Sequence, residues 1–246
     1  MKTDNRKIVF SRRIPEPKKM DKIEMDVFES ASKQSYKRWI IPLVDDALNH
    51  ASPPKEAKIL DIAGGPGFLA REFAKRSKKS HVFLVDISSY VLELAKKNCR
   101  GLKNITIRKA SVYKLPFKDN FFDIVTCKDS FHHFNKPKEA LREMLRVTKK
   151  GGVLYIQDLK RNVPQYLLRR VTPPKNLFEE LIYYSTRASY TKPEIIKILK
   201  EVAPKSFFVK TRNLTGHLER HYKKIGIETT ALKEGLQARY VAVARK

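Results

Sequence analysis

Three groups of residues in this sequence could do chemistry, and each follows a short apolar run. The first is Asp61 with Gly64, Gly65 and Gly67 in ILDIAGGPGF (59–68), where a strand pattern runs into a helix pattern. Glycines at such a turn let the backbone approach a ligand at the carboxyl end of the first strand of a doubly wound sheet. This group predicts a nucleotide-containing cofactor.

The second group is Asp86, which ends the apolar run HVFLVD (81–86). A carboxylate at this position can accept hydrogen bonds from both hydroxyls of a ribose. The glycine spacing fits the dinucleotide pattern G-x-G-x-x-G only loosely, because Ala70 must stand for the third small residue. Together, these two groups are compatible with either NAD or S-adenosylmethionine.

The third group is Asp129, His132 and His133, which follow the apolar run FFDIVTC (121–127). Imidazole accepts a proton near neutral pH, so the histidine pair is the first candidate for a general base and Asp129 the next. A second interpretation stays open, in which the pair caps a helix or packs against the cofactor.

Apolar runs and helical patterns alternate regularly from residue 58 onward. The strand patterns lie at 58–63, 81–86, 104–109, 121–127, 151–159, 206–212 and 238–245, and the helical ones at 67–77, 89–99, 136–148 and 192–202. Strands that are apolar on both faces are typical of a parallel sheet covered by helices on both sides. We therefore predict an α/β fold with a Rossmann-like, doubly wound and mostly parallel sheet of about seven strands.

Two further segments flank or interrupt this alternation. Residues 1–57 are predicted to form a basic irregular arm (1–25) and an N-terminal helical cap, with helical spacing over 26–51. Residues 58–246 are predicted to form the main domain. Within it, the basic and aromatic stretch at 160–190 breaks the pattern and is predicted to form a lid-like insertion.

The chain is strongly basic, with 52 Lys and Arg against 26 Asp and Glu and a net charge of +26. This charge favours RNA as a partner, or it reflects a lysine-rich surface without a partner; the sequence leaves both open. No apolar run is long enough to span a membrane. With no secretory signal and two cysteines, a cytoplasmic location is expected.

The sequence predicts no metal centre. Cys99 and Cys127 do not have the spacing of a cysteine metal site. His217 and His221 have the i, i+4 spacing that can bind zinc, but a third ligand is missing nearby, and a solvated helix face explains them.

Four short sequence motifs carry a resemblance to a known family. Their order and spacing are more specific than any single motif. They are LPF (115–117), FDIV (122–125), Phe-His-His (131–133) and a helix pattern leading into Gly-Gly (140–156). Over residues 58–159, the chain resembles the class I S-adenosylmethionine-dependent methyltransferases, in the branch around the ubiquinone and menaquinone C-methyltransferases.

The resemblance implies S-adenosylmethionine as the cofactor and assigns residues to its parts. Asp61 and the backbone from Ala63 to Gly67 would surround the methionyl part. Asp86 would hold the ribose, and Ile87 would pack on the adenine.

The remaining implied cofactor contacts follow the third and fourth strands. Ser111 and Val112 would lie at the adenine edge, and Cys127 and Lys128 at the end of the fourth strand, although Cys127 also reads as a core residue. Ser111 stands where the family usually has Asp. Ala63 likewise replaces the first glycine of the common D-x-G-x-G-x-G pattern.

We expect the chain to transfer methyl groups to a small aromatic or otherwise apolar metabolite. The first alternative is a tRNA or rRNA methyltransferase that uses the basic surface. Amino-methylating nucleic-acid enzymes carry Asn or Asp, two prolines and an aromatic residue after strand four, where this chain has CKDSFHHF. The second alternative is a cofactor-binding interaction module without turnover, because Ala63 and Ser111 depart from the pattern.

Overall fold

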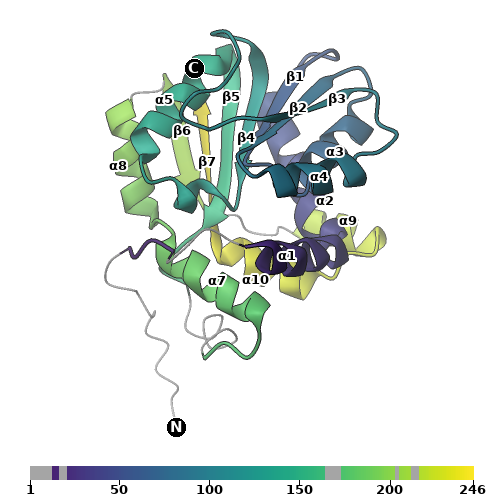
Figure 1. The fold of residues 1–246 in the computed structure, drawn as a ribbon, viewed down its shortest axis with the longest axis vertical. Helices are drawn as coiled ribbons and strands as arrows, with labels where there is room; N and C mark the ends of the chain where they lie inside the picture. The colour runs from purple at the N-terminus through teal and green to yellow at the C-terminus, as the bar shows by residue number, and fades with distance from the viewer. Residues whose placement is uncertain (1–12, 17–20, 164–172, 203–204, 212–215) are drawn as a thin grey trace.

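A seven-stranded sheet forms the centre of the computed structural model, which describes residues 13–16, 21–163, 173–202, 205–211 and 216–246 (Figure 1). The strand order is β3-β2-β1-β4-β5-β7-β6. The strands are β1 (Lys58–Ile62), β2 (His81–Asp86), β3 (Ile105–Lys109), β4 (Phe122–Lys128), β5 (Thr148–Leu159), β6 (Ser206–Lys210) and β7 (Arg239–Arg245).

The strand directions confirm the predicted doubly wound sheet. Strands β1 to β5 pair in parallel, and β7 pairs antiparallel with both β5 and β6. The chain reverses its direction of travel across the sheet between β1 and β4, where Asp61 lies opposite Thr126 and Ile62 opposite Cys127. Ligands of doubly wound folds bind outside the carboxyl ends of the strands at such a switch point.

Helices cover both faces of the sheet, as the apolar strand patterns predicted. One core cluster joins α2, α3 and α4 to residues such as Ile59, and the other joins α5 and α8 to residues such as Leu60. Neighbouring residues of β1 are therefore buried on opposite faces. The helices of the two layers are α2 (Tyr36–Ala51), α3 (Phe68–Arg76), α4 (Ser89–Asn98), α5 (Pro137–Val147) and α8 (Lys192–Val202).

The N-terminal cap consists of two helices, so the single helix predicted over 26–51 was wrong. Helix α1 (Lys22–Gln34) starts earlier because Asp21 and Glu24 form a capping box, with each side chain accepting from the other's backbone N–H at 3.0 and 2.8 Å. Ser35 separates it from α2. Residues 22–25, expected in the irregular arm, are helical.

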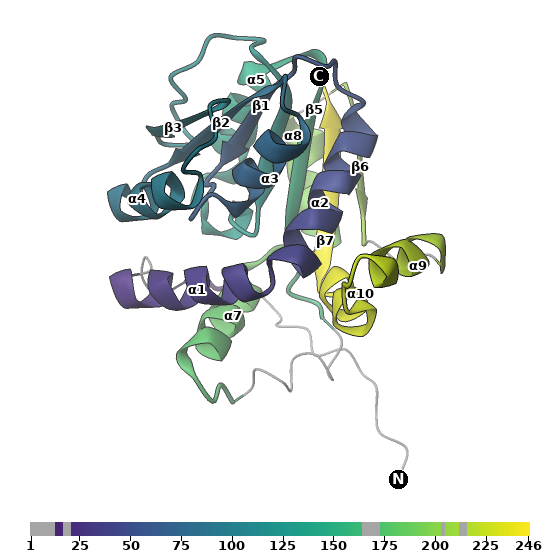
Figure 2. The ribbon, with the colours of Figure 1, turned by 90° about the vertical axis from the view of Figure 1, so that its right-hand side faces the viewer.

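Two helices cross the carboxyl ends of the parallel strands. Helix α7 (Leu177–Ala188) lies beside α1, and both are seen below the sheet in Figures 1 and 2. Helix α1 has no buried residue, and α7 buries only Thr186 and Ala188. The predicted insertion at 160–190 thus contains a helix, while its residues 164–172 lie outside the described part of the chain.

The remaining helical segments are short. They are the 3-10 helix η1 (Phe131–His133), α9 (Gly216–Lys224) and α10 (Thr229–Gln237). Among the described residues, no helix combines the length and apolar character that crossing a membrane requires.

Candidate functional site

The turn between β1 and α3 has a conformation that only residues with small side chains adopt easily. A Cβ at Gly64 would lie 2.6 Å from the Leu84 side chain and 2.9 Å from the Asp61 carboxylate. Gly65 and Gly67 have φ of 54° and 85°, and Ala63 has φ of 51°, a left-handed conformation that costs a residue with a Cβ. The turn therefore packs closely against Leu84 and the end of β1 at Gly64, while a Cβ at Gly65 would meet no atom within 4 Å.

Asp61 is the buried carboxylate beside this turn, with 1% of its surface exposed. One carboxylate oxygen, Oδ1, accepts a hydrogen bond from the Thr126 hydroxyl at 3.2 Å. The other, Oδ2, has no hydrogen-bond partner among the described residues. Burial raises the pKa of Asp61 to about 7. A buried, unpaired carboxylate oxygen calls for a hydrogen-bond donor, and an ammonium group satisfies it best.

Asp86 lies next to the turn at the end of β2. Its carboxylate accepts hydrogen bonds from the backbone N–H of Gly65 at 3.2 Å and of Ser88 at 2.9 Å, so its orientation is set by the turn itself. The following Ile87 is 56% exposed, an uncommon state for isoleucine. The structure thus places the predicted ribose carboxylate and the predicted adenine platform side by side.

The predicted contacts after β3 and in β4 offer little side-chain surface. The Ser111 hydroxyl accepts from the Tyr113 backbone N–H at 3.3 Å, while Val112 and Cys127 are buried in the core. Burial raises the pKa of the Cys127 thiol well above its usual range. For Val112 and Cys127, the backbone is the part left to contact a ligand.

Lys128 and Asp129 end β4 in an ion network. The Asp129 carboxylate accepts from the Lys128 ammonium at 2.6 Å and from the Arg239 guanidinium at 2.9 and 3.1 Å. Burial opposes ionisation of Asp129, but the two cations outweigh it and hold its pKa well below the usual range. An acid held ionised so strongly is a weak proton acceptor, so the geometry gives the base role predicted for Asp129 no support.

His132 is buried against Asp158, the acidic residue near the end of β5. The ring Nδ1 lies 2.7 Å from one Asp158 oxygen, and the His132 backbone N–H donates to the other at 2.8 Å. Burial lowers the pKa of His132, but Asp158 and Glu16 outweigh it and raise the pKa to about 10. His133 lies beside it, with ring centroids 4.1 Å apart.

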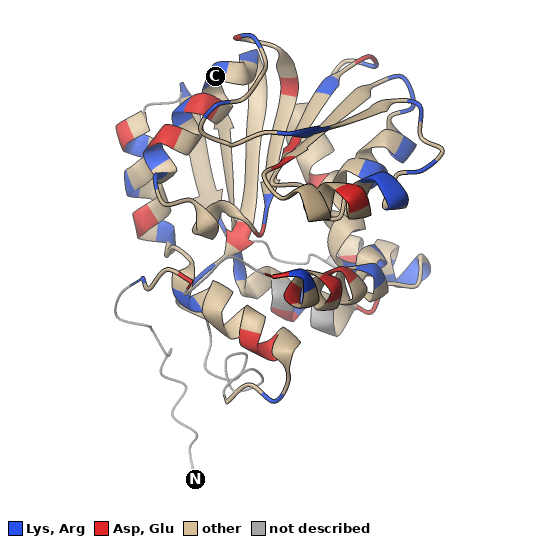
Figure 3. Cartoon of the chain, viewed as in Figure 1, with Lys and Arg blue, Asp and Glu red and all other residues tan. Residues whose placement is uncertain are grey.

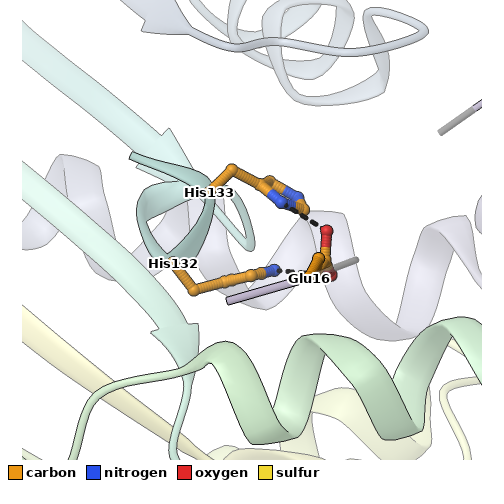
Figure 4. Close-up of side chains that lie close together, drawn as sticks. All are labelled: Glu16, His132 and His133. Atoms are coloured by element: carbon orange, nitrogen blue, oxygen red, sulfur yellow. Dashed lines mark ion pairs between the residues drawn. The ribbon is translucent and has the colours of Figure 1, made fainter. Parts of the chain in front are cut away.

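Glu16 brings the N-terminal arm to this histidine pair (Figure 4). Its carboxylate lies 2.8 Å from His133 Nδ1 and 3.7 Å from His132 Nε2, and it accepts a hydrogen bond from the Ser185 hydroxyl of α7 at 2.6 Å. Arg13 donates to the backbone carbonyls of His132 and Ala188.

Sequence reasoning missed Glu16, Arg13 and Asp158. An acidic residue near the end of the fifth strand was a usable signal for Asp158. For Glu16 and Arg13 there was none, because the arm shows no pattern that connects it to residues 131–133.

Helix α1 completes the site by covering the glycine turn. The Asn98 side-chain amide donates to the Pro66 carbonyl at 3.0 Å and to Glu29 of α1 at 3.1 Å, and the Tyr90 hydroxyl donates to Asp26. Helix α1 thus covers the turn and is held there by hydrogen bonds between polar side chains.

Comparisons with known proteins fit this arrangement. Residues 60–156 match the family described as "Methyltransferase domain". The chain is 37% identical over 116 residues to the ubiquinone/menaquinone biosynthesis C-methyltransferase UbiE of Neisseria meningitidis, an alignment that covers 46% of this chain and 47% of that protein. The chain therefore spans about half the length of the curated relatives it matches. Residues 60–156 are therefore similar to a methyltransferase domain.

Solved structures resemble the chain well beyond this methyltransferase domain. A SAM-dependent methyltransferase from Aquifex aeolicus is 20% identical and has a TM-score of 0.62, covering 92% of this chain and 98% of that one. The plantazolicin methyltransferase BpumL, in complex with SAH, is 16% identical with a TM-score of 0.70 and covers 92% and 91%. At these identities, the likeness establishes the fold.

Only some of the site residues lie within the range that matches the methyltransferase domain. The glycine turn, Asp86, His132 and His133 lie inside residues 60–156. Glu16, Asp158, Ser185 and Arg239 lie outside it. The glycine turn and the histidine pair thus lie within the matched residues, and Glu16, Asp158, Ser185 and Arg239 come from the rest of this chain.

Proposed function

We propose that this chain binds S-adenosylmethionine at the end of β1 and β2 and transfers its methyl group to a small organic acceptor. The observation that carries the proposal is the buried Asp61 oxygen without a hydrogen-bond partner among the described residues, next to a turn that approaches it closely because residue 64 is glycine. The cofactor has an ammonium group that such an oxygen can accept from. The residues of the site therefore fit the cofactor of the family.

Each neighbouring residue has one part of the cofactor to hold. Asp61 and the turn from Ala63 to Gly67 would hold the methionyl part, Asp86 the ribose hydroxyls and Ile87 the adenine. The backbone around Val112 and the end of β4 at Lys128 would close the remaining sides. Asp86 is oriented for this by the N–H groups of the turn, so little rearrangement is needed.

When bound, S-adenosylmethionine supplies a methyl group on a positively charged sulfur that is already a strong electrophile. What the chain must add is position and shelter from water. Helices α1 and α7 provide the shelter, since they cross the strand ends above the turn. His132 and His133 would then face the acceptor from η1, next to the same strand ends.

For the acceptor, we propose an aromatic or otherwise apolar metabolite. The curated relatives are named for quinone biosynthesis, and such acceptors carry flat apolar rings. On this chain, α7 contacts both η1 and α1 and carries half-buried apolar and aromatic side chains, including Leu181, Ile182 and Tyr183. Such side chains suit a ring better than a phosphate backbone.

The basic charge gives RNA no comparable support. Figure 3 shows Lys and Arg distributed over several helices and loops in the view drawn, with acidic residues between them. Many of the described cations are also paired, as Arg146 is with Glu143 and Asp119. An RNA surface is expected to present a continuous unpaired stripe.

The test is transfer of labelled methyl from S-adenosylmethionine into a cell extract that is afterwards divided into RNA, protein and small-molecule fractions. We expect label in the small-molecule fraction. It should be lost with Asp86→Ala and kept with Glu93→Ala, which replaces an exposed acidic residue on α4. Label in RNA that disappears with Asp86→Ala would overturn the acceptor class. Tight cofactor binding without any label would favour the module without turnover.

A further inference from the structure

We propose that Glu16, His132 and His133 bind a divalent transition-metal ion on the acceptor side of the site. In Figure 4 the two imidazole rings of η1 and the carboxylate of the arm point toward one another. One ligand atom from each residue lies within 4.8 Å of the other two. This site goes beyond the sequence analysis, which predicted no metal, and it does not depend on methyl transfer.

The spacing of the donor atoms suits a metal of zinc size. Zinc bonds of about 2.0–2.1 Å place neighbouring ligand atoms of a tetrahedral site about 3.3 Å apart. The observed separations are 2.8 Å from Glu16 Oε2 to His133 Nδ1 and 3.7 Å from Glu16 Oε1 to His132 Nε2, so they lie on either side of this value and involve both carboxylate oxygens. Small rotations of the side chains would bring the three atoms onto one ion.

His132 has the surroundings of a metal ligand. Its Nδ1 is held by the fully buried Asp158 at 2.7 Å, which leaves Nε2 to face Glu16. Nε2 is buried and has no hydrogen-bond partner among the described residues, and Glu16 at 3.7 Å is too far to supply one. Metal-binding histidines usually have this form, with the other ring nitrogen held by a carboxylate.

The other ligands are also positioned. Ser185 of α7 donates to Glu16 Oε1 at 2.6 Å and orients its carboxylate. Arg13, the charged neighbour of Glu16 on the arm, donates to the backbone carbonyls of His132 and Ala188, and in no described contact to a side chain of the three ligand residues. The carboxylates of Glu16 and Asp158 lie on either side of the His132 ring and make its surroundings favourable for a cation.

The ligand set also indicates the kind of site. Two imidazoles and one carboxylate suit zinc, iron, nickel or copper better than magnesium or calcium. Three protein ligands leave a coordination position open, as in catalytic rather than structural zinc sites. Because Glu16 belongs to the arm and the histidines to η1, a bound ion would also fasten the arm across the acceptor side.

The experiment is a calorimetric titration of the chelator-treated full chain with Zn²⁺, followed by Co²⁺ titration with visible absorption to report the coordination geometry. We expect one ion per chain. Asp158→Asn should weaken binding about 10–100-fold, and Glu16→Gln and His133→Gln by more than that. The matched control is His221→Gln, an exposed histidine on α9, which should leave the affinity unchanged.

Glu16→Gln is the decisive variant, because Glu16 lies on the arm and its replacement leaves the core untouched. Circular dichroism checks that each variant is folded. Undiminished binding by Glu16→Gln, or binding lost with His221→Gln, would place the ion at the surface and overturn the proposal. So would the absence of stoichiometric binding in the parent chain. The titrations contain no S-adenosylmethionine, so either proposal can fail while the other stands.

Discussion

The glycine turn and its cover are stabilised in different ways. The turn is joined to the sheet by backbone contacts, such as Gly64 N–H to the Val85 carbonyl at 3.2 Å, and it rests on fully buried strands. The cover, formed by residues 13–16, α1 and α7, buries few side chains and is held by polar pairs. The first is the proposed cofactor seat, held rigidly by the sheet, and the second is an element that can open locally.

Because the glycine turn and the cover are stabilised differently, we expect them to contribute differently to binding. A preformed seat would bind the proposed cofactor without reorganisation, while a cover of low local stability would allow reactants to enter and leave. A separate ion network at the strand ends joins Asp129, which follows β4, to Arg239 at the start of β7.

The largest expected effect on stability comes from disrupting the Asp129 ion network with Arg239→Met. Asp129 would lose one of its two cations while staying buried, which costs about 3–5 kcal/mol of unfolding free energy. Urea denaturation measures the loss. Arg245→Met, which removes an exposed arginine of the same strand, should change it far less. Equal losses in both variants would show that the network is not special.

The seat itself is probed by Gly64→Ala. The new Cβ would meet the Leu84 side chain and the Asp61 carboxylate, and overpacking of this kind costs about 1–3 kcal/mol. We also expect binding of S-adenosylhomocysteine to be lost in calorimetry. Gly101→Ala is the control, because its Cβ would meet no atom within 4 Å while its φ of 86° still imposes a backbone cost. Cofactor binding that survives Gly64→Ala would contradict the assigned seat.

Asp61 makes cofactor affinity depend on pH. With its pKa raised to about 7 by burial, the carboxylate is mostly neutral at pH 6 and mostly ionised at pH 8. Affinity for an ammonium-bearing cofactor should therefore rise about tenfold between these values. The free energy of unfolding has the opposite sign, because the unfolded chain ionises at lower pH and folding is penalised as pH rises toward 7.

Calorimetric titrations at several pH values, compared with Asp61→Asn, test this dependence. In the variant the rise in affinity should disappear, and stability above pH 7 should increase. An unchanged pH profile in Asp61→Asn would assign the dependence to another group.

A smaller effect is expected from Ala63→Gly. Relief of the left-handed φ of 51° is worth about 1–2 kcal/mol, and the greater freedom of glycine in the unfolded chain offsets about 0.4–1 kcal/mol of it. The net result should be a modest gain in thermal stability with cofactor binding kept. Ala31→Gly, inside α1, should lower stability instead. A loss of stability in Ala63→Gly would show that the turn needs the methyl group.

The smallest effect on global stability is expected in the cover, with Glu29→Ala. Removing the contact to Asn98 should change the unfolding free energy by no more than about 0.5 kcal/mol, as for most surface substitutions. Hydrogen exchange should nevertheless become faster in α1 and stay unchanged in β1 and β4. Faster exchange throughout the sheet would mean that cover and seat unfold as one unit.

The sequence was sufficient for the parts of the molecule that local patterns control. Apolar runs buried on both faces predicted the parallel sheet, which the fold confirms. The spacing of Asp61, the glycines and Asp86 predicted a cofactor turn; the fold brings these residues together, and cofactor binding there stays a prediction. Boundaries were less certain: helix α1 begins at Lys22 because a capping box satisfies its first N–H groups, a signal that the hydrophobic periodicity did not contain.

Only the tertiary structure decided the surroundings of the histidine pair. Asp158 reaches His132 because β5 pairs with β4, and Glu16 reaches both histidines because the arm packs against α7. Strand and helix patterns depend on neighbours a few residues apart, so the sequence shows them directly. Contacts between an arm, a 3-10 helix and a distant strand depend on how the whole chain packs, and no local spacing records them.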